Sequence, residues 1–362
     1  MNINLINDIQ DYIDSINTDY QSKVTTEHSF RGALKTVLTV IANDGVRKES
    51  EKILVINEPR RKSYGAPDFE FRKHDDAIAF LETKNLGDND IKGANSKKHK
   101  EQFDRYKKAV NMIAFTDYLR FYLYEEGEEI LSAVIGIIKD GVIIFNEDEL
   151  QISNFFKIIE KLANSKPQPI RSANKLSETM AAKAKIIANI LNNAMAKEDK
   201  EQTDEDEGLH LKLKAFKKFL VHDMTKEQFA DFYAQTILYG LFIARINDNT
   251  PHSFTLQEAA DLIPSFNPFL KKIFKLLALA ELHSHIKWIV DDLVSIFKVT
   301  DINKVLRNYG KDPLVHFYEN FLEDYNPKIK EQFGVWYTPI EVVRFIVNSV
   351  DNILKHKLNI EE

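Results

Sequence analysis

The feature that most constrains the fold of this chain is a change of hydrophobic period along its length. Before about residue 165, short apolar runs typical of β-strands alternate with segments of helical period. Beyond residue 208, the apolar residues recur only at helical spacing. The first part therefore predicts a mixed α/β domain around a central sheet, and the second part predicts an all-α region.

The expected elements can be placed along the chain from these periods. In the first part, helices are expected at 27–43, 98–110 and 147–162, and strands at 53–56, 68–72, 77–84, 111–116, 120–124, 130–138 and 142–145. In the second part, helices are expected at 211–220, 226–246, 256–262, 268–286, 288–297 and 313–325. A last amphipathic helix is expected to present one apolar face, made of Val342, Phe345, Ile346, Val350 and Ile353.

Two polar segments predict the domain boundaries. Residues 164–172 contain two prolines, which end the preceding helix. Residues 197–208 contain seven carboxylates, two lysines and no apolar anchor, so a solvated loop or a disordered linker is expected there. The predicted division is a first domain at 1–165, a linker at 166–210, a helical domain at 211–330 and a final segment at 331–362.

Composition excludes several classes of protein. Of the 362 residues 44% are hydrophobic, which excludes wholesale disorder, and the net charge of −6 excludes a uniformly basic nucleic-acid coat. The absence of cysteine excludes disulfides, thiolate zinc sites and a cysteine nucleophile. No apolar run is long enough to span a bilayer and the N-terminus has no signal-peptide pattern, so a cytoplasmic protein without a membrane partner is expected.

Three charged residues around one predicted hairpin suggest a catalytic site. Glu82 and Lys84 project from the same face of a strand, and Asp68 lies beside Glu82 if the two strands pair. Two carboxylates can hold Mg²⁺, a cation that prefers oxygen ligands, polarises a phosphate and lowers the pKa of a bound water. A nearby ammonium can orient that water or stabilise the charge that develops on phosphorus. The trio therefore suits hydrolysis of a phosphodiester, although an exposed hairpin with an ordinary Glu–Lys pair is the alternative.

The order Pro67-Asp68, then Glu82-Thr83-Lys84, resembles the PD-(D/E)xK nuclease superfamily in its restriction-endonuclease branch. The resemblance implies that Asp68 and Glu82 bind Mg²⁺ and that Lys84 orients or activates water. Many members add a glutamate from the preceding helix, and Glu27 is the candidate here. The implied fold is a restriction-endonuclease-like α/β domain followed by an all-α helical coupler domain.

A second motif of these nucleases, Q-x-x-x-Y, follows on the next predicted helix as Gln102 and Tyr106, which share one face. In the family this element supports the active site and contacts DNA. Basic residues are dense around it, with seven Lys/Arg against two carboxylates from residue 92 to residue 108. Such a patch would hold a DNA backbone, although each lysine singly could belong to a solvated helix face. The candidate DNA contacts are Arg60, Arg61, Lys62, Lys97, Lys98 and Arg105.

The end of the chain suggests a second activity. Residues 229–245 and 311–347 are similar to the coupler and the coupler–methyltransferase junction of single-chain type ISP and type IIG restriction–modification enzymes. These enzymes carry an adenine-N6 methyltransferase, and the resemblance places Tyr337, Thr338 and Pro339 in its S-adenosylmethionine pocket. Thr338 and Pro339 also suit the start of a helix as N-cap and first helical residue.

Two methyltransferase motifs do not occur in the sequence. These are the glycine-containing cofactor loop after the first strand and the (N/D)-P-P-(Y/F) element that holds an extruded base. A truncated or split gene is therefore expected, and S-adenosylmethionine is expected to bind only if the missing region is supplied. No Walker phosphate loop occurs either, so an ATP-driven translocase is not expected.

Three functions remain open. The first is a Mg²⁺-dependent DNA endonuclease module acting on double-stranded DNA. The second is a truncated or split component of an adenine-N6 DNA methyltransferase, acting with a methyltransferase and target-recognition polypeptide. The third is a non-catalytic remnant. The histidines His222, His283, His285 and His316 show no metal-ligand spacing and are interpreted as structural.

Overall fold

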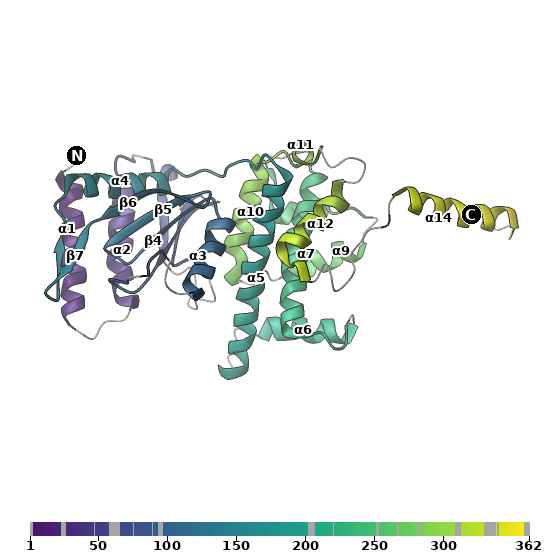
Figure 1. Ribbon diagram of the computed structural model, residues 1–362, viewed down its shortest axis with the longest axis horizontal. Helices are drawn as coiled ribbons and strands as arrows, with labels where there is room; N and C mark the ends of the chain where they lie inside the picture. The colour runs from purple at the N-terminus through teal and green to yellow at the C-terminus, as the bar shows by residue number, and fades with distance from the viewer. Residues whose placement is uncertain are drawn as a thin grey trace.

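The chain forms a mixed α/β part followed by a helical part in the computed structural model (Figure 1). The structure describes residues 3–22, 27–46, 48–57, 66–74, 76–88, 90–92, 97–201, 207–219, 221–250, 253–265, 268–280, 282, 284–307, 313–328, 338 and 340–357. In the α/β part the helices are α1 (Ile3–Gln21), α2 (Glu27–Ala42), α3 (Lys97–Ala109) and α4 (Glu149–Ala163). The strands are β1 (Ile53–Asn57), β2 (Phe69–Lys73), β3 (Asp76–Thr83), β4 (Met112–Thr116), β5 (Arg120–Glu125), β6 (Glu128–Val134), β7 (Gly136–Lys139) and β8 (Val142–Phe145).

The helical part begins after the proline-containing segment. It comprises α5 (Ala173–Glu201), α6 (Glu207–Phe219), α7 (Lys226–Ile246), α8 (Leu256–Leu262), α9 (Pro268–Phe274), α10 (Lys287–Val299), α11 (Ile302–Leu306), α12 (Pro313–Tyr325) and α14 (Ile340–Lys357). Short π-helical and 3-10 turns occupy Lys275–Ala280 and Ser284–Ile286. The architecture is therefore α/β followed by α-helical, as the hydrophobic periods predict.

The central sheet has six strands that lie in sequence order, β1 to β6. All neighbours are antiparallel except β3 and β4, which are parallel because α3 crosses over between them. The β2–β3 pair is the predicted hairpin, with Phe69 opposite Leu81. This register places Asp68, one residue before β2, next to Glu82 near the end of β3.

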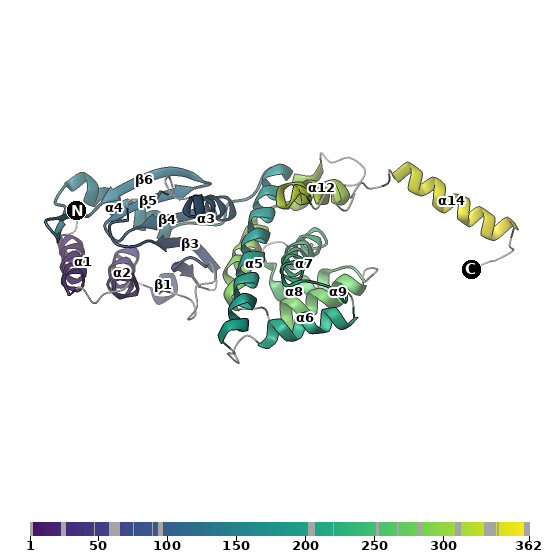
Figure 2. The same ribbon diagram turned by 60° about the horizontal axis from the view of Figure 1, so that its bottom comes forward.

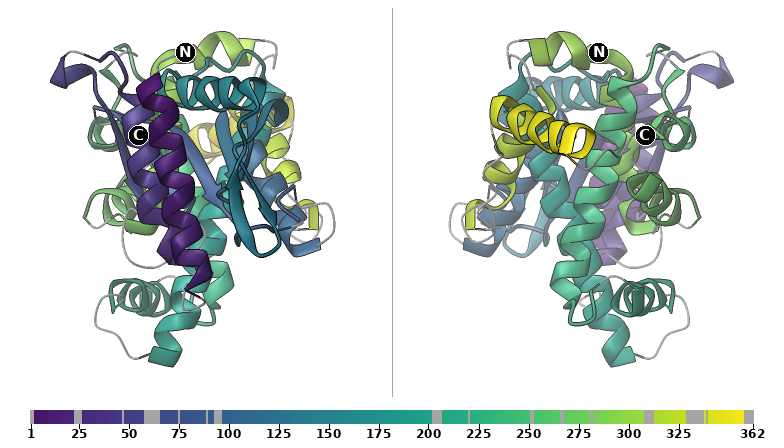
Figure 3. Two further views of the ribbon diagram at one scale, coloured as in Figure 1. Left: turned by 90° about the vertical axis from the view of Figure 1, so that its left-hand side faces the viewer. Right: turned by 90° about the vertical axis from the view of Figure 1, so that its right-hand side faces the viewer.

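The two faces of the sheet enter different cores. Phe69 and Leu81 pack into a core with α1, α2 and α4. Phe80 points to the other face and belongs to a second core, together with Phe103 of α3 and the helices of the second part. The left view of Figure 3, which faces the N-terminal helices, shows α1 in front of the sheet. The sheet is thus covered by its own helices on one face, and by α3 and the helical part on the other.

The helical part docks directly on the sheet. Trp288 of α10 is buried, with its ring centroid 5.1 Å from that of Phe80 in β3 and 6.5 Å from that of Tyr106 in α3. At the β2–β3 turn, the ammonium of Lys298 lies 3.1 Å from a carboxylate oxygen of Asp76. Figure 2 shows α5 between the sheet and helices α7, α8 and α9. One hydrophobic core therefore runs through both parts of the chain.

A helix replaces most of the linker expected at 166–210. Helix α5 is 29 residues long, and its apolar residues Leu176, Met180, Ile187 and Leu191 are buried. Lys183 of this helix is also buried and pairs with Asp292 of α10. The acidic segment expected to be a loop is helical up to residue 201, because Lys and Glu are strong helix formers.

Two further elements are shorter than expected. The strand expected at 130–138 divides into β6 and β7, and a Cβ at Gly136 would lie 2.9 Å from the Leu119 side chain, so the break needs glycine. The helix expected at 268–286 changes to a π-helical turn after Phe274. The Phe274 ring packs so closely on α7 that a Cβ at Gly240 would lie 2.3 Å from it.

The last helix, α14, stands apart from the others (Figure 1). Its predicted apolar face is exposed, with relative exposures from 44% to 72% at Val342, Phe345, Ile346, Val350 and Ile353. None of the helices in the described ranges is both long and apolar enough to cross a lipid bilayer.

The contact of Trp288 with the sheet predicts a large loss of stability on truncation. Trp288→Ala should lower the unfolding free energy by about 3–5 kcal/mol, because it leaves a cavity between α10, β3 and α3. Urea unfolding followed by circular dichroism measures this loss. Leu211→Ala, at a position that is 61% exposed, is the control and should change the free energy by less than about 0.5 kcal/mol. Equal effects of the two variants would contradict the docking.

Candidate active site

The carboxylate of Asp68 is held by partners from two elements. Its Oδ1 lies 2.7 Å from a guanidinium nitrogen of Arg31, which comes from α2. Its Oδ2 accepts hydrogen bonds from the backbone N–H of Thr83 at 2.7 Å and from the Thr83 hydroxyl at 2.6 Å. All three residues are buried. These contacts fix Asp68 at the end of β3, where the hairpin register brings it.

Glu82 and Lys84 meet a side chain from α3. The Lys84 ammonium donates to Glu82 Oε1 at 3.0 Å and to Gln102 Oε1 at 3.3 Å. The Gln102 amide in turn donates to Glu82 Oε1 at 3.1 Å. The backbone N–H of Lys84 donates to the carbonyl of Thr116, so this cluster lies where the parallel strands β3 and β4 end.

Glu82 has a strongly perturbed pKa. Burial, and secondly the charge of Asp68, raise the pKa of Glu82 to about 8, although Lys84 and Arg31 act in the opposite direction. Its second oxygen, Oε2, is buried and has no hydrogen-bond partner. An acceptor in this state costs free energy unless a proton or a cation satisfies it. The site is therefore suited to a positively charged ligand.

Tyr106 lies one turn beyond Gln102 on α3 and is fully enclosed. Burial, and secondly the charge of Glu82, raise the pKa of its phenol, whereas a hydrogen bond with Gln102 acts in the opposite direction. The Q-x-x-x-Y residues thus lie on one helix face beside Glu82. Because Tyr106 also packs near Trp288, this face is held by the helical part of the chain.

The residues fit a Mg²⁺ ion by their chemistry. Mg²⁺ keeps several waters and binds proteins through one or two carboxylates, so Glu82 can supply one ligand, and Asp68 a second when the ion takes the place of a partner now on its oxygens, Arg31 or Thr83. The buried, unsatisfied Oε2 of Glu82 is an oxygen donor of the required kind. Within the described ranges, no group of three or more His, Cys, Asp or Glu side chains has metal-binding geometry. Glu27, the predicted third ligand, begins α2, but its side chain lies outside the described part.

The remaining predicted residues are placed as follows. Arg105 is half-buried on α3, where its Nε donates to the carbonyl of Glu101. Thr338 is exposed. Lys97 and Lys98 belong to α3, but their side chains are outside the described part, as are the whole of Arg60, Arg61, Lys62, Tyr337 and Pro339.

Two residues that touch Asp68 were not predicted from the sequence. The guanidinium of Arg31 pairs with the carboxylate of Asp68. Thr83, whose side chain alternates with those of Glu82 and Lys84 along β3, donates to the same carboxylate. A signal for Arg31 exists, since it lies four residues after Glu27 and therefore on the same face of α2. Thr83 carried no such signal, because its role depends on the bend of the chain at Asp68.

Comparison with known proteins adds a match at the end of the chain. Residues 309–359 match the family model described as N-6 DNA methylase, which is less than half of the chain. No curated protein matches. Among solved structures, the chain is similar to one described as "cryoEM structure DrdV-DNA complex", at 19% identity and a TM-score of 0.33. The alignment covers 98% of this chain and 32% of that chain, so this chain spans about a third of its length.

The raised pKa of Glu82 predicts a pH-dependent stability. The folded pKa of about 8 exceeds the unfolded value of 4.5, so the contribution of Glu82 is complete below pH 4.5 and is lost as the pH rises to about 8. Between pH 5.5 and 7.5 the wild type should lose about 2 kcal/mol more unfolding free energy than Glu82→Gln. Urea unfolding in the presence of a chelator measures both. Parallel pH dependences would show that Glu82 ionises normally.

Proposed function

We propose that this chain is a Mg²⁺-dependent DNA endonuclease module of a restriction–modification enzyme. The observation that carries the proposal is the hydrogen-bonded cluster of Glu82, Lys84 and Gln102, next to Asp68, at the ends of β3 and β4. Two buried carboxylates and an ammonium in this arrangement are the groups that hydrolysis of a phosphodiester requires.

Each residue has a definite role in this proposal. Asp68 and Glu82 would hold the ion, with Glu27 as a third ligand, and the Oε2 of Glu82, which has no hydrogen-bond partner, would be the available oxygen once the carboxyl group is ionised. Bound Mg²⁺ would supply polarisation of the scissile phosphate and a lowered pKa of the attacking water. Lys84, only partly exposed, orients that water or stabilises the developing charge. Gln102 keeps Lys84 and Glu82 in place.

The proposed substrate is double-stranded DNA. Helix α3 places Gln102 at the cluster and carries Lys100, Arg105, Lys107 and Lys108 on the same short element. A basic helix beside a metal site would contact the phosphate backbone and contribute affinity that does not depend on sequence. The further candidates Arg60, Arg61, Lys62, Lys97 and Lys98 would extend this contact.

A second candidate function is that of a component of an adenine-N6 DNA methyltransferase. The match of residues 309–359 to the N-6 DNA methylase family supports it. So does α14, whose apolar face is exposed and would be covered by further methyltransferase structure. A methyltransferase and target-recognition region, on this or another polypeptide, would be the partner, and S-adenosylmethionine would be its cofactor, with Tyr337, Thr338 and Pro339 near it.

The nuclease proposal predicts loss of activity from two substitutions. Lys84→Ala and Asp68→Ala should lower Mg²⁺-dependent nicking of supercoiled plasmid at least about 100-fold, because each removes a charge that acts on the transition state. Lys52→Ala, which removes an exposed ammonium paired with Glu49, is the control and should nick normally. Circular dichroism should show that all three variants are folded.

Metal binding provides a readout that is independent of turnover. Calorimetric titration with Mn²⁺ should show one class of site in the wild type and none in Asp68→Ala. Nicking by Lys84→Ala at the wild-type rate would contradict the assignment of a nuclease site. So would a heat of Mn²⁺ binding that is the same in Asp68→Ala as in the wild type.

Cofactor binding discriminates the two candidate functions. If this chain acts as a nuclease module, titration with S-adenosylmethionine should give no heat with the chain alone, because the methyltransferase cofactor loop is absent from its sequence. Saturable binding would favour the methyltransferase component. Titration with S-adenosylhomocysteine should give the same result as titration with S-adenosylmethionine, because one methyltransferase pocket would bind both.

A further inference from the structure

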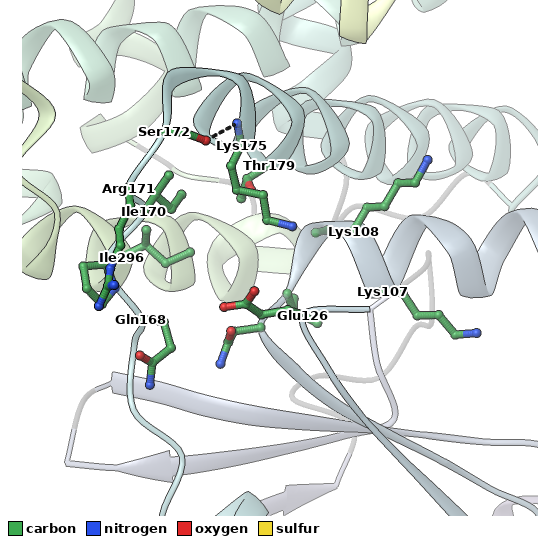
Figure 4. Close-up of a pocket in the computed structure, with 14 residues that line it drawn as sticks. Lys107, Lys108, Glu126, Gln168, Ile170, Arg171, Ser172, Lys175, Thr179 and Ile296 are labelled. Atoms are coloured by element: carbon green, nitrogen blue, oxygen red, sulfur yellow. Dashed lines mark hydrogen bonds between the residues drawn. The ribbon is translucent and has the colours of Figure 1, made fainter. Parts of the chain in front are cut away.

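A cleft of about 390 Å³ lies where the α/β part meets the helical part. Its walls are the end of α3, the β5–β6 turn, residues 168–172 and the first turns of α5 (Figure 4). We call it the junction cleft, and its charged residues are Lys107, Lys108, Glu126, Arg171 and Lys175. Four of these five are cations, in a chain whose net charge is −6.

Three of these cations, Lys108, Arg171 and Lys175, are exposed to solvent. Within the part of the chain that the structure describes, Lys108, Arg171 and Lys175 form no ion pair with a carboxylate. Their charge is therefore available to an anion that enters the cleft from solvent.

The cations do not converge on one point. Figure 4 shows the Lys175 side chain extending from the first turn of α5 toward the end of α3, whereas Lys107 and Lys108 extend from the end of α3 away from Lys175. The Lys107 ammonium lies 4.1 Å from the ring centroid of Tyr124 in β5. A single small anion would need converging donors, whereas separate cations can each contact one of the closely spaced phosphates of a DNA backbone.

Helix α5 adds to this potential. Its N-terminus opens on the cleft, where the Ser172 hydroxyl accepts from the backbone N–H of Lys175 at 3.3 Å. The partial positive charge of a helix N-terminus favours a phosphate at this end.

The junction cleft is next to the candidate active site along α3. Gln102 contacts the cluster and Lys108 lines the cleft, and six residues of helix separate them by about 9 Å along the axis and about 120° around it. We propose that the junction cleft is a second binding site for the phosphate backbone of double-stranded DNA, which holds the duplex across the two parts of the chain. This inference rests on the proposed DNA substrate and extends the contact beyond α3.

Charge reversal tests the proposal through DNA binding. The double variant Lys108→Glu/Lys175→Glu and the wild type are compared by fluorescence anisotropy with a labelled 30-base-pair duplex in a chelator, so that cleavage plays no part. The variant should bind roughly tenfold more weakly, and its slope of log K against log salt should fall by about 2, because two phosphate contacts are lost. Lys157→Glu/Lys161→Glu on exposed positions of α4 is the control, with the same change of net charge.

The outcomes separate this proposal from the nuclease proposal. An unchanged slope in the double variant, or an equal loss in the control, would overturn the junction site while leaving the nuclease assignment intact. Binding of pyrophosphate at the cleft without any effect of the double variant on DNA would also overturn it. Conversely, Lys84→Ala could nick normally while the double variant shows a lowered slope of log K against log salt. That result would contradict the nuclease proposal and support the junction cleft as a DNA-binding site.

Discussion

Burial of α3 between the sheet and the helical part is the constraint on which the candidate site depends. Phe103 packs edge-on against Phe115 of β4, with ring centroids 4.3 Å apart, and Tyr106 lies near Trp288 of α10. These contacts leave α3 little freedom to rotate. Gln102, which is half-buried one turn before Tyr106, therefore meets Lys84 and Glu82 without the cost of ordering a loop.

The same burial makes the two carboxylates of the cluster energetically unfavourable when no cation is bound. Asp68 and Glu82 are buried carboxylates at neighbouring positions, and only one of them has a full set of partners, from Arg31 and Thr83. A proton on Glu82 relieves the repulsion in the absence of a cation, at the expense of an oxygen without a partner. Structural sites seldom keep such a group, since an apolar residue of the same shape would be more stable. A cation-binding role, as proposed above, would account for a carboxylate at this position.

Local pattern was sufficient for much of this arrangement, and long-range packing accounts for the rest. The β2–β3 hairpin, the common face of Glu82 and Lys84, and the common face of Gln102 and Tyr106 follow from the periods of strand and helix. Helix α5 was missed because polar and proline-rich neighbours outweighed its own apolar spacing. The partner of Asp68 and the contact of Trp288 involve residues far apart in sequence, which no local pattern specifies.

The continuous core also determines what the helical part can do. A flexible linker would let the two parts move independently, so that cations on one would have no fixed distance from a site on the other. Here α5 packs on α3, and α10 packs on β3. The spacing between the carboxylates of β3 and the cations of the junction cleft is therefore set by packing. A duplex that binds both would be positioned before any chemistry occurs, and a rigid joint, unlike a tether, adds this selectivity without a further loss of entropy.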